Sequence, residues 1–170
     1  MDREQLRALQ KPFKDRYRND PDSARITIEA TGRLLPDRIA CGLPGIPHPV
    51  IAGLHPAAGG DGSFACAAEL LLQALVGCAG TTLCAVATAM NVPLSGEVTA
   101  RGTLDMRGTL GVDRTVPVGF TEIDLLYRLD TSADDATVQR MLEATERYCV
   151  VLQTLARPPE IRTAFERPRA

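Results

Sequence analysis

One stretch decides how this chain folds: residues 69–90 read ELLLQALVGCAGTTLCAVATAM. Residues 70–90 carry no charged side chain. Drawn as a helix at 1.5 Å per residue, they form a rod about 32 Å long. A helix that is apolar on every side is normally buried on every side. We therefore predict a buried central helix, and we expect a second subunit to help cover it.

The same stretch is long enough to span a bilayer. However, Gln73, Gly77 and Gly80 dilute it, together with the adjacent threonines 81 and 82, and neither end carries the Lys or Arg that anchors a membrane helix. The rest of the sequence has the patterns of soluble strands and helices. We therefore favour a core helix and predict no membrane association.

Composition indicates one soluble domain with a flanking arm. The chain has 170 residues, of which 45% are hydrophobic and 24% charged. We assign residues 1–20 to a charged, amphipathic N-terminal arm and residues 21–170 to a single domain. A net charge of -2 and the lack of any Trp argue against nucleic-acid binding.

The cysteines point to a reducing compartment. Five cysteines at irregular spacing make neither a disulfide framework nor a zinc motif. The first 20 residues lack the apolar core of a secretory signal. His48 and His55, each before a proline, are too few for a metal site. We predict a cytoplasmic protein without metal or cofactor, in which a cysteine pair is more often redox-active than structural.

Alternating and helical patterns predict an α+β domain, an antiparallel sheet packed on the long helix and on a second helix. A phase change near Thr121 indicates a β-bulge. The second helix, which Ser132 or Asp134 can cap, places Cys149 on its buried stripe. We expect strands over residues 24–30, 33–41, 50–54, 94–106, 116–129 and 161–165, and helices over 69–90 and 135–149.

The two cysteines that lie within helical patterns have two readings. A thiol in such a place is usually a small buried hydrophobe, and burial raises its pKa and makes it inert. Cys78, in the middle of the long helix, becomes a nucleophile only if a cation reaches it and a second sulfur can meet it. Cys66, near the helix start, is the rival nucleophile, whereas Cys84 points to another side of the helix and Cys41 has no evident partner.

Three passages together resemble the OsmC/Ohr family of thiol-dependent hydroperoxide reductases. The first passage, AAELLLQALVGCAGTTL, is similar to the family's central helix. The second, ERYCVVLQTL, is similar to its second-cysteine segment. The third, EATGRLL, is similar to an arginine-bearing strand–turn. The resemblance implies that Cys78 attacks the peroxide, that Cys149 resolves the product, and that Arg33 supports the reactive sulfur. It covers about residues 24–167.

The resemblance also implies partners. It predicts an organic hydroperoxide as substrate, a dithiol reductant that is often lipoyl-type, and an intertwined homodimer whose central helices pack together. Leu71, Leu72 and Leu75 would contribute to an aliphatic pocket for the substrate.

The sequence departs from the family pattern at two positions. The family's glutamate, ten residues before the reactive cysteine, is Ala68 here, and Glu69 is one residue late. We include Glu69 in the predicted catalytic set. The proline that usually follows the second cysteine is Val150.

Two other functions stay open at this level. One is a non-enzymatic dimer that binds a small apolar ligand, and the other is a thiol redox sensor without turnover. We favour the enzyme.

Overall fold

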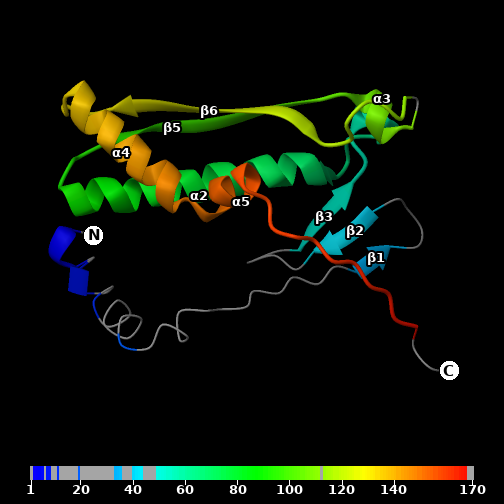
Figure 1. The fold of residues 1–170 in the computed structure, drawn as a ribbon, viewed down its shortest axis with the longest axis horizontal. Helices are drawn as coiled ribbons and strands as arrows, with labels where there is room; N and C mark the ends of the chain where they lie inside the picture. Colours follow the sequence, from blue (N-terminus) through cyan, green and yellow to red (C-terminus); the bar gives the residue numbers. More distant parts are fainter. Residues whose placement is uncertain are drawn as a thin grey trace.

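The computed structural model describes residues 2–5, 7, 8, 11, 19, 33–35, 40–43, 49–111 and 113–167, with the backbone alone for 33–35 and 40–43. Within them, a long helix lies under a two-stranded sheet, with two further helices packed against it and a small four-stranded sheet near its N-terminal end (Figure 1). The elements are β1 (Arg33–Leu35), β2 (Ala40–Leu43), β3 (Val50–Gly53), η2 (Pro56–Ala58), β4 (Ala65–Cys66), α2 (Ala67–Met90), β5 (Ser95–Leu104), α3 (Met106–Thr109), β6 (Phe120–Asp130), α4 (Asp135–Tyr148) and α5 (Val150–Ala156).

The predicted central helix is confirmed as α2. It begins where the backbone N–H of Cys66 donates a 3.1 Å hydrogen bond to Glu69, which satisfies one of the unpaired donors at the helix start. It ends at Asn91, whose φ of 58° gives the left-handed turn that commonly closes a helix. One line of side chains along α2 is buried, namely Leu75, Ala79, Leu83 and Ala87.

The β5–β6 pair covers this buried line. The strands run antiparallel from Ser95 opposite Asp130 to Leu104 opposite Phe120. The register shifts at Leu104, so that Thr121 has no partner in the ladder and forms the predicted bulge. Alternate residues then face α2, as one-sided burial of an antiparallel sheet requires.

The second predicted helix is α4, and it ends at a break that the sequence did not indicate. Asp134 caps its start by accepting a hydrogen bond from the N–H of Thr137. Cys149 then has extended backbone angles, φ -72° and ψ 107°, and the chain resumes as α5. Gln153 holds this break, because its N–H donates to the carbonyl of Cys149 and its side chain donates to the carbonyl of Glu146.

The small sheet corrects one prediction. Residues 33–41 were expected to form one strand, but they contribute to two, β1 and β2, which pair antiparallel with Arg33 opposite Gly42. The strand β3 was predicted and is confirmed, and β4 pairs with it in parallel. The predicted strand at 24–30 lies outside the described residues, as does most of the N-terminal arm.

The predicted strand over residues 161–165 is wrong. Residues 157–167 have no regular structure, and the side chains of Ile161 and Phe165 are 81% and 82% exposed. Alternating residues form a strand only where an edge offers hydrogen bonds, and no described strand pairs with this segment.

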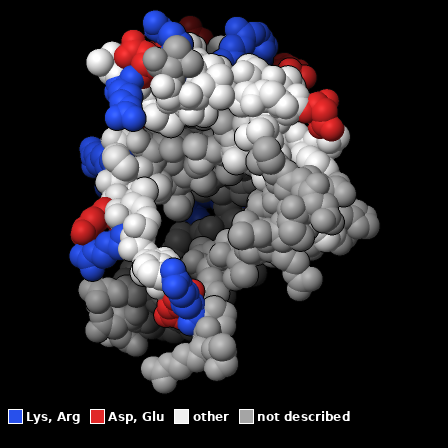
Figure 2. Space-filling model, turned by 90° about the vertical axis from the view of Figure 1, so that its right-hand side faces the viewer, with Lys and Arg blue, Asp and Glu red and all other residues white. Residues whose placement is uncertain are grey.

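The opposite face of α2 is uncovered in the single chain. Its exposed residues are mostly small or apolar: Leu71, Gln73, Ala74, Gly77, Thr81, Cys84 and Ala89. Figure 2 shows the charged side chains of the described residues mainly toward the outer edge of that view. By length and composition α2 could cross a membrane, but core helices of soluble proteins pass the same test.

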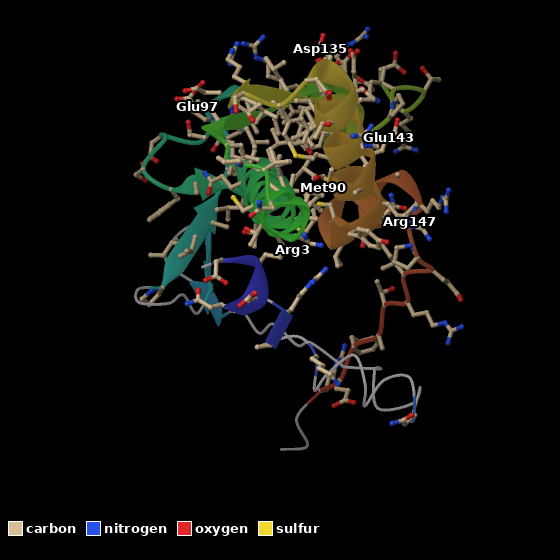
Figure 3. All side chains as sticks on the ribbon, turned by 90° about the vertical axis from the view of Figure 1, so that its left-hand side faces the viewer. Arg3, Met90, Glu97, Asp135, Glu143 and Arg147 are labelled. Carbon is tan, nitrogen blue, oxygen red and sulfur yellow. The ribbon has the colours of Figure 1, made fainter. Side chains whose placement is uncertain are left out.

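The charged side chains of the upper layer point outward. Figure 3 shows Glu97, Asp135, Glu143 and Arg147 around the outside of β5 and α4, whereas Met90 marks the end of α2 beneath them. The core therefore lies between α2, the β5–β6 pair and α4, and it is aliphatic, as the scarcity of aromatic residues requires.

Candidate functional site

The structure brings together the two cysteines that the sequence analysis singled out. Cys149 is completely buried in a cluster with Leu75 and Ala79, and Cys78 packs against the same cluster while keeping part of its surface exposed. The two thiols are hydrogen-bonded to each other, and both are reduced. The pair is therefore in contact, with one sulfur open to solvent and the other closed off.

The surroundings of Cys78 favour its thiolate. Burial raises the pKa of this thiol, but hydrogen bonds from the Val151 amide, the Cys149 thiol and the Val150 amide outweigh that effect. The pKa of Cys78 is consequently lowered from its ordinary value. The two amides are the first of α5, where backbone N–H groups have no helical acceptor and stabilise an anion.

The surroundings of Cys149 have the opposite effect. Burial raises the pKa of this thiol, and the neighbouring Cys78 adds to the increase, while the amides of Leu152 and Val151 offset only part of it. Cys78 is therefore the first of the pair to ionise, and Cys149 remains a thiol that can donate a hydrogen bond to it. This is the asymmetry that an attacking and a resolving sulfur need.

Val150 contributes through its backbone alone. Its side chain is 71% exposed, whereas its N–H donates to the Cys78 sulfur. A proline at this position, as the resemblance leads one to expect, has no N–H to donate. The departure from the family pattern at Val150 thus adds a donor to the site.

The two other predicted site residues are placed differently. Arg33 begins β1 and pairs with Gly42, and its side chain lies outside the described part of the chain. Glu69 bonds to the N–H of Cys66 at the start of α2. Nine residues separate it from Cys78, which corresponds to about half a turn around the helix and about 13.5 Å along it. Roles for Arg33 and Glu69 in chemistry stay predictions.

An apolar groove lies beside the cysteine pair. It has a volume of about 300 Å³. Several of its lining residues also pack against the cluster around Cys149, so the groove and the thiols share walls. Leu75 is the one of the three leucines predicted to line a substrate pocket that lines this groove. The complete lining is Leu75, Phe120, Thr121, Glu122, Ile123, Leu125, Leu152, Leu155 and Ala156.

The remaining described cysteines do not join the pair. Cys66 precedes α2, and Cys84 lies on the exposed face of that helix. The side chains that the structure describes include no group of three or more His, Cys, Asp or Glu residues suited to a metal ion. The chemistry of the described site thus rests on Cys78 and Cys149.

Comparisons with known proteins concern the family and the fold of the chain. A sequence model of the OsmC-like protein family matches residues 60–164. A search of curated protein sequences finds no match.

Solved structures share the fold at low sequence identity. An OsmC-like protein from Mycoplasma pneumoniae has a TM-score of 0.64 and 16% identity, over 78% of this chain and 89% of that one. An OsmC-like protein of unknown function from Vibrio cholerae has a TM-score of 0.59 and 13% identity, over 75% and 94%. The organic hydroperoxide resistance protein OhrB of Bacillus subtilis has a TM-score of 0.50 and 18% identity, over 78% and 93%.

Replacing Val150 tests whether its amide stabilises the Cys78 thiolate. We expect Val150→Pro to slow alkylation of Cys78 at pH 7 about threefold to tenfold, because a partly exposed anion loses one donor. The pH at which alkylation is half-maximal should rise. Mapping of iodoacetamide-labelled peptides across pH measures both quantities.

Val150→Ala is the matched control, since it trims the same side chain but keeps the N–H, and it should alkylate like the parent. Cys149 already has the extended conformation that a residue before proline prefers, so the substitution should be tolerated. Equal alkylation rates in the proline and alanine variants would show that the amide is not part of the site.

Proposed function

This chain belongs to the OsmC-like protein family, and we propose that it reduces organic hydroperoxides with a pair of thiols as a defence against oxidative stress. Family membership supports a role in hydroperoxide resistance. The observation that carries the specific proposal is the contact between Cys78 and Cys149, whose pKa values are displaced in opposite directions.

The proposed reaction has three steps. The Cys78 thiolate attacks the peroxide oxygen farther from the organic group, so that the O–O bond breaks, an alcohol leaves after taking up a proton, and Cys78 becomes a sulfenic acid. The Cys149 sulfur then bonds to the Cys78 sulfur, and the S–O bond breaks with loss of water. An external dithiol, which the family resemblance suggests is lipoyl-type, finally reduces the disulfide.

One feature of the structure supports an organic substrate, and the proposal adds a supporting cation. The groove beside the thiols is lined mostly by aliphatic and aromatic side chains, which suit an organic group better than hydrogen peroxide. In this proposal Arg33 lies near the reactive sulfur. A guanidinium suits this role, since it stays charged and can hydrogen-bond peroxide oxygens.

We further propose that the protein acts as a homodimer in the cytoplasm. The face of α2 opposite the β5–β6 pair is apolar and uncovered, and a second copy of the helix would bury it. Gly77 lies on this face, and a side chain added there would meet nothing within 4 Å in the single chain. Five cysteines at irregular spacing favour a reducing compartment.

Substituting the two cysteines separately tests the reaction. With cumene hydroperoxide and a dithiol, we expect Cys78→Ser to lower turnover at least about a hundredfold, because the nucleophile is lost. Cys149→Ser should still react once and accumulate a sulfenic acid that dimedone traps on Cys78. Cys84→Ser, which alters an exposed cysteine outside the pair, is the control and should behave like the parent.

Intact-mass analysis after one equivalent of hydroperoxide separates the alternatives. The proposal requires loss of two hydrogens, mapped to a Cys78–Cys149 disulfide, followed by turnover with dithiol. A disulfide that forms without turnover would instead identify a sensor. Unreactive thiols would leave the non-enzymatic ligand-binding dimer, and undiminished turnover in Cys78→Ser would contradict the assignment of the nucleophile.

A bulky residue at Gly77 tests the dimer. We expect Gly77→Leu to convert the dimer to a monomer at micromolar concentration, because the helices can no longer approach closely, while the helix itself gains propensity. Light scattering after size exclusion measures the mass. Ala136→Leu, at an exposed position of α4, is the control and should stay dimeric. A parent that is monomeric, or a Gly77→Leu variant that remains dimeric, would rule out this interface.

A further inference from the structure

An aromatic ring stands in the apolar groove at a distance from the cysteine pair. Phe120, the first residue of β6, lines the groove and pairs with Leu104 at the end of the ladder beside α3 (Figure 1). The cluster around Cys149 instead packs against the middle of the two strands, at Ala100 and Leu125. Along β5, Ala100 and Leu104 are about 13 Å apart. The groove therefore extends from beside the thiols to the ring.

The near end of the groove adjoins the reactive sulfur. Leu75, which lines it, lies three residues before Cys78 on α2, and residues three apart on a helix are neighbours on its surface. Leu152 lines the groove from α5. Both leucines also belong to the cluster around Cys149, against which Cys78 packs. An organic group bound in the groove thus begins beside Cys78 and extends toward Phe120.

A glycine on the neighbouring strand makes room for the ring. Gly102 pairs with Ile123, so it is the diagonal neighbour of Phe120 across the ladder. A methyl group added at Gly102 would lie 2.4 Å from the nearest atom of the Phe120 ring. The ring therefore fills the place that a side chain at Gly102 would take. Because it extends back from the end of the ladder, the open part of the groove is shorter than the stretch from Ala100 to Leu104.

A second pocket adjoins the groove at the ring. Its volume is about 470 Å³, and its lining includes Leu104, the ladder partner of Phe120, and Thr121, the next residue along β6. Thr121 lines both cavities, whereas Phe120 lines the groove and not the second pocket. The ring thus stands where the two cavities meet. A smaller side chain at this position would join them into one longer channel.

We propose that Phe120 determines substrate specificity: its ring ends the groove and limits the organic group of the hydroperoxide to a compact one, such as a short alkyl chain or a single aromatic ring. The inference rests on the proposed function and names the substrate class of that site. Each methylene buried in an apolar site strengthens binding up to about fourfold. Methylenes that the groove cannot cover stay in water and add nothing, so the chain length at which catalytic efficiency stops rising reports where the groove ends.

Straight-chain hydroperoxides of increasing length measure the groove. The butyl, hexyl and decyl compounds carry the same reacting group and differ only in their chains. With the full chain and a dithiol, we expect kcat/KM of the parent to rise from butyl to hexyl and to differ less than about threefold between hexyl and decyl. In Phe120→Ala it should rise at least about tenfold from hexyl to decyl, because the channel continues past the ring's place. The butyl value should stay within about twofold of the parent.

Two further variants accompany this one. Phe120→Leu retains more of the apolar packing, so it keeps the test valid if the alanine variant does not fold, and it should show a smaller rise in the same direction. Val118→Ala is the matched control, because Val118 lies two residues earlier, is 65% exposed and lines neither cavity. It should show the parent's dependence on chain length.

The proposal is overturned if both Phe120 variants keep the parent's dependence on chain length. Hexanol and decanol test the groove without the reaction, through their protection of Cys78 from iodoacetamide. The two alcohols should protect the parent at similar concentrations, whereas decanol should protect Phe120→Ala at a concentration at least about tenfold lower than hexanol. Equal protection of that variant would also overturn the proposal. If the parent reduces none of the hydroperoxides but the alcohols behave as expected, the peroxidase function is wrong and the role of Phe120 stands.

Discussion

The site depends on the break in the helix at Cys149. If α4 continued through this residue, the amides of Val150 and Val151 would bond to carbonyls one turn earlier and could not reach a sulfur. Instead the chain extends for one residue, and Gln153 supplies the donor that the carbonyl of Glu146 loses. The freed amides then point at Cys78 on the neighbouring helix. A local backbone feature of one helix thus lowers the pKa of a thiol on another.

The two sulfurs differ because they occupy different depths of the same cluster. Cys78 has solvent on one side and hydrogen-bond donors on the other, which favours its anion. Cys149 has no exposed surface, and burial keeps it protonated. The same aliphatic packing also forms a groove along one side of the pair. In the proposed reaction this geometry lets a substrate meet the accessible sulfur first and holds the second within bonding reach.

Periodic signals in the sequence predicted the elements whose burial repeats regularly. The long helix, the bulge at Thr121 and the buried stripe that ends at Cys149 all follow from such repeats. The break at Cys149 could not be predicted, because the segment Cys149–Val150–Val151 contains neither Gly nor Pro and the break is held by a side chain four residues later. The strand expected at 161–165 failed for a related reason: alternation gives a residue pattern but not a neighbouring edge. The resemblance identified the cysteine pair, but only the folded chain shows that backbone amides reach Cys78.

The two departures from the family pattern both concern the proposed support of the Cys78 thiolate. The resemblance leads one to expect a glutamate at position 68 that supports the arginine, and alanine there removes that support for a side-chain cation. The expected proline at position 150 would remove an amide, and valine there retains it as a donor to the reactive sulfur. Stabilisation of a thiolate needs positive potential, and it makes little difference whether a guanidinium or oriented N–H groups provide it. In the proposed function, the Cys78 thiolate therefore draws support from the backbone amide of Val150, whatever support the Arg33 guanidinium adds.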